Sequence, residues 1–167
     1  MSNNVLVING SARSNNNTAK LVRHLLGEDI DMIELSEFKV SQYDYDGNYD
    51  DYDSFQNIAD RMIEADVIII STPVYWYSMS GHMKAFIDRW TDLVSTHKEK
   101  GRTLKGKKVA LITQSTSAAM PEGFELPIKL TAEYMDMEYL GGIFWDMRRP
   151  LSEINEIKSD IKNWDLG

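Results

Sequence analysis

A stretch of small and polar residues near the N-terminus has the composition of a phosphate-binding loop. It spans residues 9–18, reads Asn-Gly-Ser-Ala-Arg-Ser-Asn-Asn-Asn-Thr, and follows an apolar run at residues 5–8. Apolar residues at helical spacing begin at Leu21, so the loop leads into a helix N-terminus, where free N–H groups and the helix dipole attract an anion. The side-chain donors that we expect there are those of Ser11, Arg13, Asn15, Asn16, Asn17 and Thr18.

Two further loops carry groups of a different kind. Residues 73–78 read Pro-Val-Tyr-Trp-Tyr-Ser and follow the apolar run at 67–70. Residues 114–123 are rich in Ser, Thr and Ala and follow the run at 109–113. The first loop offers aromatic side chains and the second offers small polar ones.

The side chains offer little for catalysis by themselves. The chain has no cysteine, which excludes disulfides, thiolate metal sites, iron–sulfur clusters and a cysteine nucleophile. His24, His82 and His97 form no constellation with a hydroxyl and a carboxylate, and we interpret each as a surface or capping residue. We therefore predict no catalytic side chain.

Length and charge limit the class of protein. The chain has 167 residues and no low-complexity linker, which fits one domain over residues 1–167. Its net charge of −8 argues against a nucleic-acid partner. No apolar run approaches the ~18 residues that span a bilayer, and the polar N-terminus runs directly into the first strand. We expect a soluble, cytoplasmic protein with a small-molecule partner and no membrane partner.

Strand and helix patterns alternate along the chain. Strands are predicted at residues 5–8, 31–35, 67–70, 109–113 and 139–144, with a helix after each. This alternation favours a doubly wound α/β fold with a five-stranded parallel sheet and helices on both faces. The three loops leave carboxyl ends of its strands and would meet at one edge. Together they describe a mononucleotide with a flat, partly polar ring, which is the shape of FMN.

Four details of the helices are also predicted. Asp53 would cap the second helix, and Ser152 would cap the last. The third would run without a break over residues 79–94. The fourth would begin near Leu126, with Pro127 in its first turn, and its inward face would consist of Ile128, Leu130, Tyr134 and Met135.

The runs at residues 9–18 and 71–90 closely resemble the flavodoxin-like NAD(P)H-dependent FMN reductases and quinone reductases. The second run is the more specific, because a Pro-x-Tyr-Trp loop before a helix with Lys-x-Phe-x-Asp-Arg rarely arises by chance. The resemblance covers most of the chain in element order. It implies a flavodoxin-like fold with strand order 2-1-3-4-5, tightly bound FMN, NADPH or NADH as co-substrate, and a homodimer.

The resemblance also implies which residues hold the cofactor. In the first loop, Ser11, Arg13, Asn17 and Thr18 match phosphate-loop positions of the family. The loop against the isoalloxazine ring is matched by Pro73, Val74, Tyr75 and Trp76, and the third flavin loop is matched, by position only, by Gln114, Ser115, Thr116 and Ser117. Lys84, Asp88 and Arg89 belong to the family motif too, and we favour a structural role for them, with the Asp–Arg pair anchoring the helix.

The leading hypothesis is an oxidoreductase that passes a hydride from NAD(P)H through FMN to a quinone, a nitro or azo compound, or free flavin. An electron-carrier flavodoxin, reduced by a protein partner, is the alternative. A signalling receiver domain on the same fold needs an acidic pair after the first strand and an Asp after the third. This chain has Asn9-Gly10 and Ser71-Thr72 at those places, so we set the receiver hypothesis aside.

Two segments are left without a clear function. Residues 42–54, here called the Tyr/Asp loop, alternate Tyr and Asp but lack the Gly and Glu of a calcium-binding loop. We expect a solvated loop, with an active-site border or a subunit contact as the alternative. Residues 97–108, the basic stretch, are interpreted as a solvated connection rather than a coenzyme phosphate site, because they lead to the opposite edge of the sheet.

Overall fold

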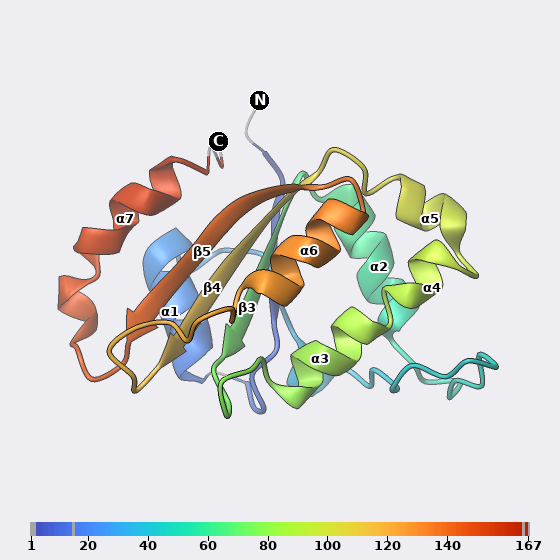
Figure 1. The fold of residues 1–167 in the computed structure, drawn as a ribbon, viewed down its shortest axis with the longest axis horizontal. Helices are drawn as coiled ribbons and strands as arrows, with labels where there is room; N and C mark the ends of the chain where they lie inside the picture. The colour runs from blue at the N-terminus through green and yellow to red at the C-terminus, as the bar shows by residue number, and fades with distance from the viewer. Residues whose placement is uncertain (1–2, 15, 165, 167) are drawn as a thin grey trace.

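The computed structural model of the chain describes residues 3–14, 16–164 and 166. Its centre is a five-stranded parallel sheet in the predicted order β2-β1-β3-β4-β5 (Figure 1). The strands are β1 (Val5–Asn9), β2 (Met32–Glu34), β3 (Val67–Pro73), β4 (Lys108–Ser115) and β5 (Glu138–Asp146). The whole of β3 is buried, as expected for a central strand covered on both faces.

Helices cover both faces of this sheet. They are α1 (Asn17–Leu26), α2 (Phe55–Glu64), α3 (Gly81–Asp88), α4 (Thr91–Val94), α5 (Lys98–Arg102), α6 (Leu126–Tyr134) and α7 (Asn155–Lys162), with 3₁₀ turns η1 (Leu35–Glu37) and η2 (Leu151–Glu153). One apolar core lies under α2, α3, α4 and α6, and a second lies under α1 and α7. None of the helices in the described part of the chain is long and apolar enough to span a membrane.

The helix predicted over residues 79–94 is divided in two. Between α3 and α4 the backbone hydrogen bonds span three residues instead of four. Trp90 N donates to Ile87 O (3.0 Å), and Asp92 N donates to Arg89 O (3.0 Å). These are i to i−3 bonds, typical of a 3₁₀ turn. The side chain of Arg89, which lies at this turn, is only 1% exposed. We attribute the break to the polar partners that this buried cation reaches.

The start of α6 is predicted correctly, but its buried face is not. Pro127 lies in its first turn, and the buried residues of α6 are Ile128 and Ala132. Leu130 and Tyr134 are 52% and 76% exposed, so the prediction that they face the core is wrong. They follow Leu126 at intervals of four residues, on a separate stripe of the helix.

Two other predictions need correction. The basic stretch contains a helix, α5, where a connection was expected. Gly101 allows α5 to pack on α4, because a Cβ there would lie 2.0 Å from Leu93 O. The last helix, α7, has Ile154 as its N-cap rather than Ser152, since the turn η2 follows Pro150 and delays the helix. The alternation of strands with single helices is therefore interrupted at these places.

Candidate functional site

Buried polar side chains gather at the carboxyl ends of the central strands. Asn9 ends β1, Ser71 and Thr72 lie near the end of β3, and Thr113 and Gln114 lie near the end of β4. All five are at most 6% exposed. Thr113 Oγ1 donates to Thr72 O at 2.7 Å, which ties two of these strand ends together. The edge of the sheet at which parallel folds bind ligands thus has a polar floor.

The predicted phosphate loop is shaped by Asn16, the N-cap of α1. Its Oδ1 accepts from Ala19 N (2.9 Å) and its Nδ2 donates to Arg13 O (2.5 Å). Within the described residues, the N–H groups of Asn17 and Thr18 have no hydrogen-bond partner. Asn15 lies outside the described residues. The anion site stays a prediction, with free N–H groups to support it, whereas the amide of Asn16 is committed to the cap.

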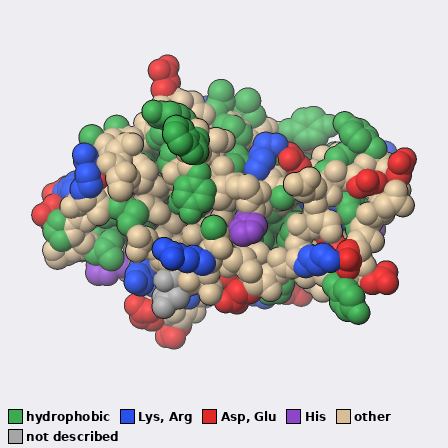
Figure 2. Space-filling view, turned by 90° about the horizontal axis from the view of Figure 1, so that it is seen from below, with side chains coloured by type: hydrophobic (Ala, Val, Ile, Leu, Met, Phe, Trp, Pro, Cys, Tyr) green, Lys and Arg blue, Asp and Glu red, His purple; other side chains and the backbone are tan. Residues whose placement is uncertain are grey.

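The aromatic loop is a tight hairpin with an unusual backbone. Tyr75 N donates to Ser78 O (2.8 Å), and Ser78 N donates to Tyr75 O (3.1 Å). Between them, Trp76 and Tyr77 have φ angles of 49° and 66°, a left-handed conformation that costs non-glycine residues on the order of 1–3 kcal/mol each. Their side chains are 93% and 77% exposed. Figure 2 looks onto this edge and shows hydrophobic side chains gathered over the hairpin.

Ser80 joins the aromatic hairpin to the phosphate loop. Its hydroxyl donates to Gly10 O, and its N–H donates to Thr72 Oγ1 (3.1 Å). The same hydroxyl accepts from Met83 N (3.1 Å) and so caps α3. Gly10 is needed for this approach, because a Cβ there would lie 2.6 Å from Met83 Cβ. The two loops are therefore positioned by one shared contact.

A cleft of about 350 Å³ opens between the three loops. Eleven of the predicted cofactor-binding residues line it, namely Ser11, Arg13, Asn16, Asn17, Thr18, Pro73, Val74, Tyr75, Gln114, Ser115 and Thr116. Trp76 and Ser117 are not among its lining residues, and both are exposed. Met147 lines the cleft but was not predicted. Met147 directly follows β5, whose carboxyl end lies at the same edge of the sheet. Its position after a predicted strand could therefore have placed it at the cleft.

Gln114 tests whether this cleft fits FMN. Its Nε2 donates to Thr18 Oγ1 (2.9 Å), but its buried Oε1 has no hydrogen-bond partner among the described residues. Buried polar atoms are nearly always hydrogen-bonded, so a ligand group is expected to complete this one. The Thr18 hydroxyl still has its own hydrogen to donate. Hydroxyl groups on the chain of FMN and oxygens of its phosphate match these needs, so the donor set fits the cofactor.

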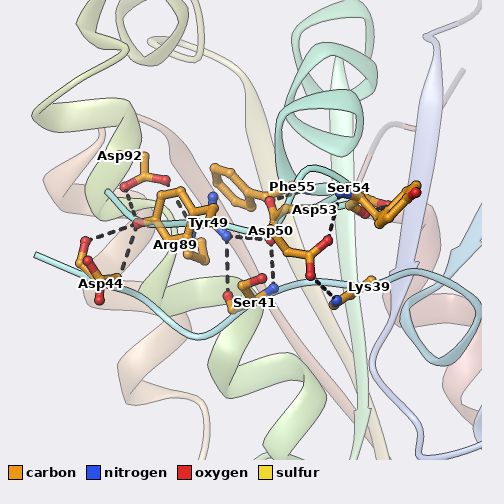
Figure 3. A network of polar contacts seen from close by, with 11 residues as sticks. Lys39, Ser41, Asp44, Tyr49, Asp50, Asp53, Ser54, Phe55, Arg89 and Asp92 are labelled. Atoms are coloured by element: carbon orange, nitrogen blue, oxygen red, sulfur yellow. Dashed lines mark hydrogen bonds and ion pairs between the residues drawn. The ribbon is translucent and has the colours of Figure 1, made fainter. Parts of the chain in front are cut away.

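Arg89 holds the Tyr/Asp loop through several polar contacts (Figure 3). Its Nη1 donates to Asp53 Oδ2 (2.8 Å) and to Ser41 O (3.2 Å), and its Nε donates to Asp92 Oδ2 (2.9 Å). The guanidinium carbon lies 3.5 Å from the centre of the Tyr49 ring, a cation–π contact. The Asp53 and Asp92 side chains are 7% and 5% exposed. One buried cation thus joins the loop to α4.

The ionisation of this cluster follows from its contacts. Burial opposes the charged form of Asp53, but hydrogen bonds from Arg89 and from the N–H groups of Ser41 and Phe55 outweigh it and lower the pKa of Asp53. Burial likewise opposes the charge of Arg89, and its carboxylate partners raise its pKa nonetheless. Burial and the hydrogen bond to Asp92 raise the pKa of Tyr49. The charged forms of Asp53 and Arg89 and the neutral form of Tyr49 are therefore favoured.

The prediction of a solvated loop is correct for one part of the segment and wrong for the other. Tyr45 and Tyr52 are 93% and 80% exposed. Tyr49 and Asp53 instead face Arg89, a partner far along the chain. The N-cap of α2 is Ser54, so the prediction of Asp53 as the cap is wrong by one residue, although Asp53 Oδ1 accepts from Phe55 N (3.1 Å) at the start of the helix.

Asp88 and Arg89 of the family motif do not form one anchor together, because each has different partners. Asp88 pairs with Lys84 (2.6 Å) on the surface of α3. The neighbouring Arg89 turns inward to Asp53 and Asp92. The structural role of Arg89 is therefore supported, with other carboxylates than Asp88 as its partners.

The basic stretch lies at the opposite edge of the sheet and ends at Lys108, the first residue of β4. Several of its cations are paired with acids. Lys100 lies 2.5 Å from Asp60, and Lys105 lies 3.1 Å from Asp136. Such exposed pairs contribute little stability, and the stretch lines no part of the cleft. The stretch therefore joins α4 to β4 away from the cleft, as predicted, although part of it is the helix α5.

Solved structures share this fold. The Trp repressor binding protein from Bacillus subtilis superposes with a TM-score of 0.71 at 23% identity and covers 98% of both chains. The flavoenzyme NAD(P)H:(acceptor) oxidoreductase FerB from Paracoccus denitrificans gives a TM-score of 0.67 at 18% identity, over 98% of this chain and 95% of FerB. At these identities the likeness shows the flavodoxin-like fold alone.

Sequence relatives are more informative about the family. A Bacillus subtilis (strain 168) protein described as an NAD(P)H-dependent FMN-containing oxidoreductase, YwqN, is 36% identical over 96 residues, 52% of this chain and 51% of YwqN. The FMN-dependent NADPH-azoreductase of Staphylococcus haemolyticus (strain JCSC1435) is 32% identical over 93 residues, 50% of each chain. The alignments thus span about half the length of these relatives.

A family description covers a larger part of the chain than either relative. Residues 3–145 match the model of the NADPH-dependent FMN reductases, and this range includes β1 to β4, nearly all of β5 and all three cleft loops. The resemblance seen in the two sequence motifs is confirmed. The chain belongs to the NADPH-dependent FMN reductase family.

Proposed function

We propose that the chain is an oxidoreductase that binds FMN in the cleft between its three loops and moves electrons from NAD(P)H to a small acceptor. The observation that carries the proposal is the cleft itself. It combines free N–H groups at the start of α1 with the unsatisfied carbonyl of Gln114 and an aromatic hairpin. Bound FMN would accept a hydride from the reduced nicotinamide and pass two electrons to the acceptor.

The residues of the chain would hold and orient the cofactor rather than react. Asn17 and Thr18 would receive the phosphate with their backbone N–H groups, helped by the hydroxyl of buried Ser11 and by the exposed Arg13. Gln114 would bind a hydroxyl of the ribityl chain through its free carbonyl. The hairpin at Tyr75 would border the ring and leave one side accessible to substrates.

The acceptor that we propose is a flat aromatic compound such as a quinone, a nitro or azo compound, or free flavin. Trp76 and Tyr77 are held outward by a strained turn, and strain of this kind is commonly retained at functional sites. A relative named as an azoreductase supports the same class of acceptor. A net charge of −8 favours small molecules over nucleic acids as partners. We include a cytoplasmic location in the proposal.

The proposal also includes a homodimer. Leu126, Leu130 and Tyr134 form an exposed stripe along α6, and Ile87 and Val94 line the half-buried groove beside it. Apolar surfaces of this kind mark protein contacts, and a second copy would cover both. Sedimentation analysis of the wild-type chain and of Leu130→Glu tests this, with a dimer expected for the first and a monomer for the second. A monomeric wild-type chain would remove the dimer from the proposal.

The activity is tested with purified protein loaded with FMN. We expect a flavin absorption spectrum that bleaches when NADPH or NADH is added without oxygen, and recovers when a quinone or azo dye is added. Failure to bind FMN, or failure of both coenzymes to bleach it, would contradict the proposal. Slow bleaching by NAD(P)H with fast reduction by a reductase protein would favour the flavodoxin-type electron carrier instead.

A further inference from the structure

A second groove, separate from the flavin cleft, lies between the Tyr/Asp loop and α3. One wall is the start of the Tyr/Asp loop, with Gln42, Tyr43 and Tyr45, and the other is the outer side of α3, with Gly81, Lys84 and Asp88. Its volume is about 660 Å³, compared with about 350 Å³ for the flavin cleft. A groove of this size is large enough for a substantial part of a small-molecule ligand.

The groove and the flavin cleft share no lining residue, but residues 76–80 connect them along the chain. Gly81, which lines the groove, is the first residue of α3, and Ser80 before it is bonded to Gly10 in the phosphate loop. The aromatic hairpin lies immediately upstream of Ser80. A ligand with one end at the hairpin can therefore extend along α3 into the groove, without entering the cleft that FMN would fill.

The loop wall of the groove is preformed. Arg89 ties the loop to α4 through Asp53 and Asp92, both nearly fully buried (Figure 3). Burying three charges brings a desolvation cost that their attraction does not clearly exceed, so stability alone does not explain the cluster. Its physical effect is to hold a polar loop at a fixed distance from α3, as a binding groove requires.

The groups in the groove suit an adenosine diphosphate. Tyr43 and Tyr45 form an edge-to-face pair with ring centres 5.1 Å apart, and Tyr45 is 93% exposed, which leaves a ring face for a purine base to stack on. Lys84, in α3, brings to the wall of the groove a cation that can pair with a pyrophosphate. Its bond to Asp88 joins two half-exposed groups and can be exchanged for a phosphate at little cost.

We propose that this groove binds the adenosine diphosphate half of the reduced nicotinamide dinucleotide, while the nicotinamide half reaches the aromatic hairpin. The assignment rests on the proposed NAD(P)H-dependent activity and adds to it a binding site for the part of the coenzyme that does not react. It also gives the Tyr/Asp loop a function.

The first experiment measures binding without turnover. Calorimetric titration of the FMN-loaded chain with ADP, and separately with 2′,5′-ADP, is compared for wild type, Tyr45→Ala, Lys84→Ala and Tyr52→Ala. We expect about tenfold weaker binding in the first two variants, the scale of one lost stacking or charged contact. Tyr52→Ala is the matched control, because Tyr52 is 80% exposed on the same loop but lines no part of the groove. No binding of either fragment, or equal binding in all variants, would overturn the assignment.

The second experiment separates this inference from the activity on which it rests. Flavin bleaching is followed with NADPH, NADH and reduced nicotinamide mononucleotide, which lacks the adenylate half. The KM of the better dinucleotide should rise about tenfold in Tyr45→Ala, toward that of the mononucleotide, whose own KM should not change. Equal KM values for mononucleotide and dinucleotides in the wild type would reject the adenylate site while leaving the activity intact. Failure of all three donors would reject the activity itself.

Discussion

The loop after β1 and the loop after β2 leave neighbouring strands at the same edge of the sheet, but they are held by different means. The phosphate loop is organised locally, because Asn16 caps α1 and bonds to Arg13 within the same segment. The Tyr/Asp loop is organised from a distance, by Arg89 at the junction of α3 and α4. Its own internal bonds, such as Asp46 N to Asp44 Oδ1, only shape its exposed tip.

This difference separates two kinds of design. In the phosphate loop, the cap Asn16 satisfies the N–H of Ala19 and leaves the N–H groups of Asn17 and Thr18 for a ligand. A loop held by a buried ion cluster depends on every member of the cluster, since removal of one charge leaves the others buried and uncompensated. Changes to Arg89 should therefore affect stability, whereas changes to the phosphate loop should affect ligand affinity.

The largest expected effect is that of Arg89→Ala. Loss of this cation leaves Asp53 and Asp92 buried without a partner, and we expect unfolding in urea to require about 3–5 kcal/mol less free energy. Arg61→Ala is the matched control, because the Arg61–Asp31 pair is half exposed and should cost less than about 1 kcal/mol. Similar losses for the two variants would show that the buried cluster does not hold the loop.

The same contrast explains what the sequence reveals. The alternation of strands and helices and the three polar or aromatic loops follow from local patterns, such as an apolar run that ends in small polar residues. The strand order and the individual cleft residues are implied by the resemblance to the FMN reductases. The partner of Asp53 could not be found in that way, because Arg89 lies 36 positions along the chain and only the fold brings the two together. Leu130 and Tyr134 fit a helical period equally well facing in or out, so periodicity alone could not place them.

Ser11→Ala combined with Thr18→Ala should have the next largest effect. Both residues line the cleft, and a hydrogen bond to a charged group contributes about 1.5–3 kcal/mol, so we expect FMN to bind at least ~100-fold more weakly. Flavin fluorescence during titration measures this. Riboflavin, which has no phosphate, should lose much less affinity, and Ser14→Ala, an exposed residue of the same loop, should leave FMN binding unchanged. Equal losses for FMN and riboflavin would contradict a phosphate role.

Two substitutions of Trp76 separate its ring from its backbone strain. Both Trp76→Ala and Trp76→Gly should raise the KM of a quinone or azo acceptor about tenfold while FMN affinity changes little, because Trp76 lies outside the cleft lining. Only the glycine variant adopts a φ of 49° without strain, so it alone should stabilise the fold, by about 1 kcal/mol. The measurements are steady-state kinetics and urea unfolding. An unchanged KM in both variants would place the acceptor elsewhere.

Acid should loosen the Tyr/Asp loop before it affects the phosphate loop. Because the pKa of Asp53 is lowered in the fold, the unfolded chain binds more protons near the ordinary Asp value of about 3.9. The contribution of Asp53 to stability is thus complete above that pH and is lost as the pH falls through its lower folded value. Amide hydrogen exchange from pH 6 to 3, corrected for the intrinsic rate, should show protection falling first around Asp53. Asp53→Asn should flatten that dependence, and parallel profiles in the two proteins would mean that another group controls the loop.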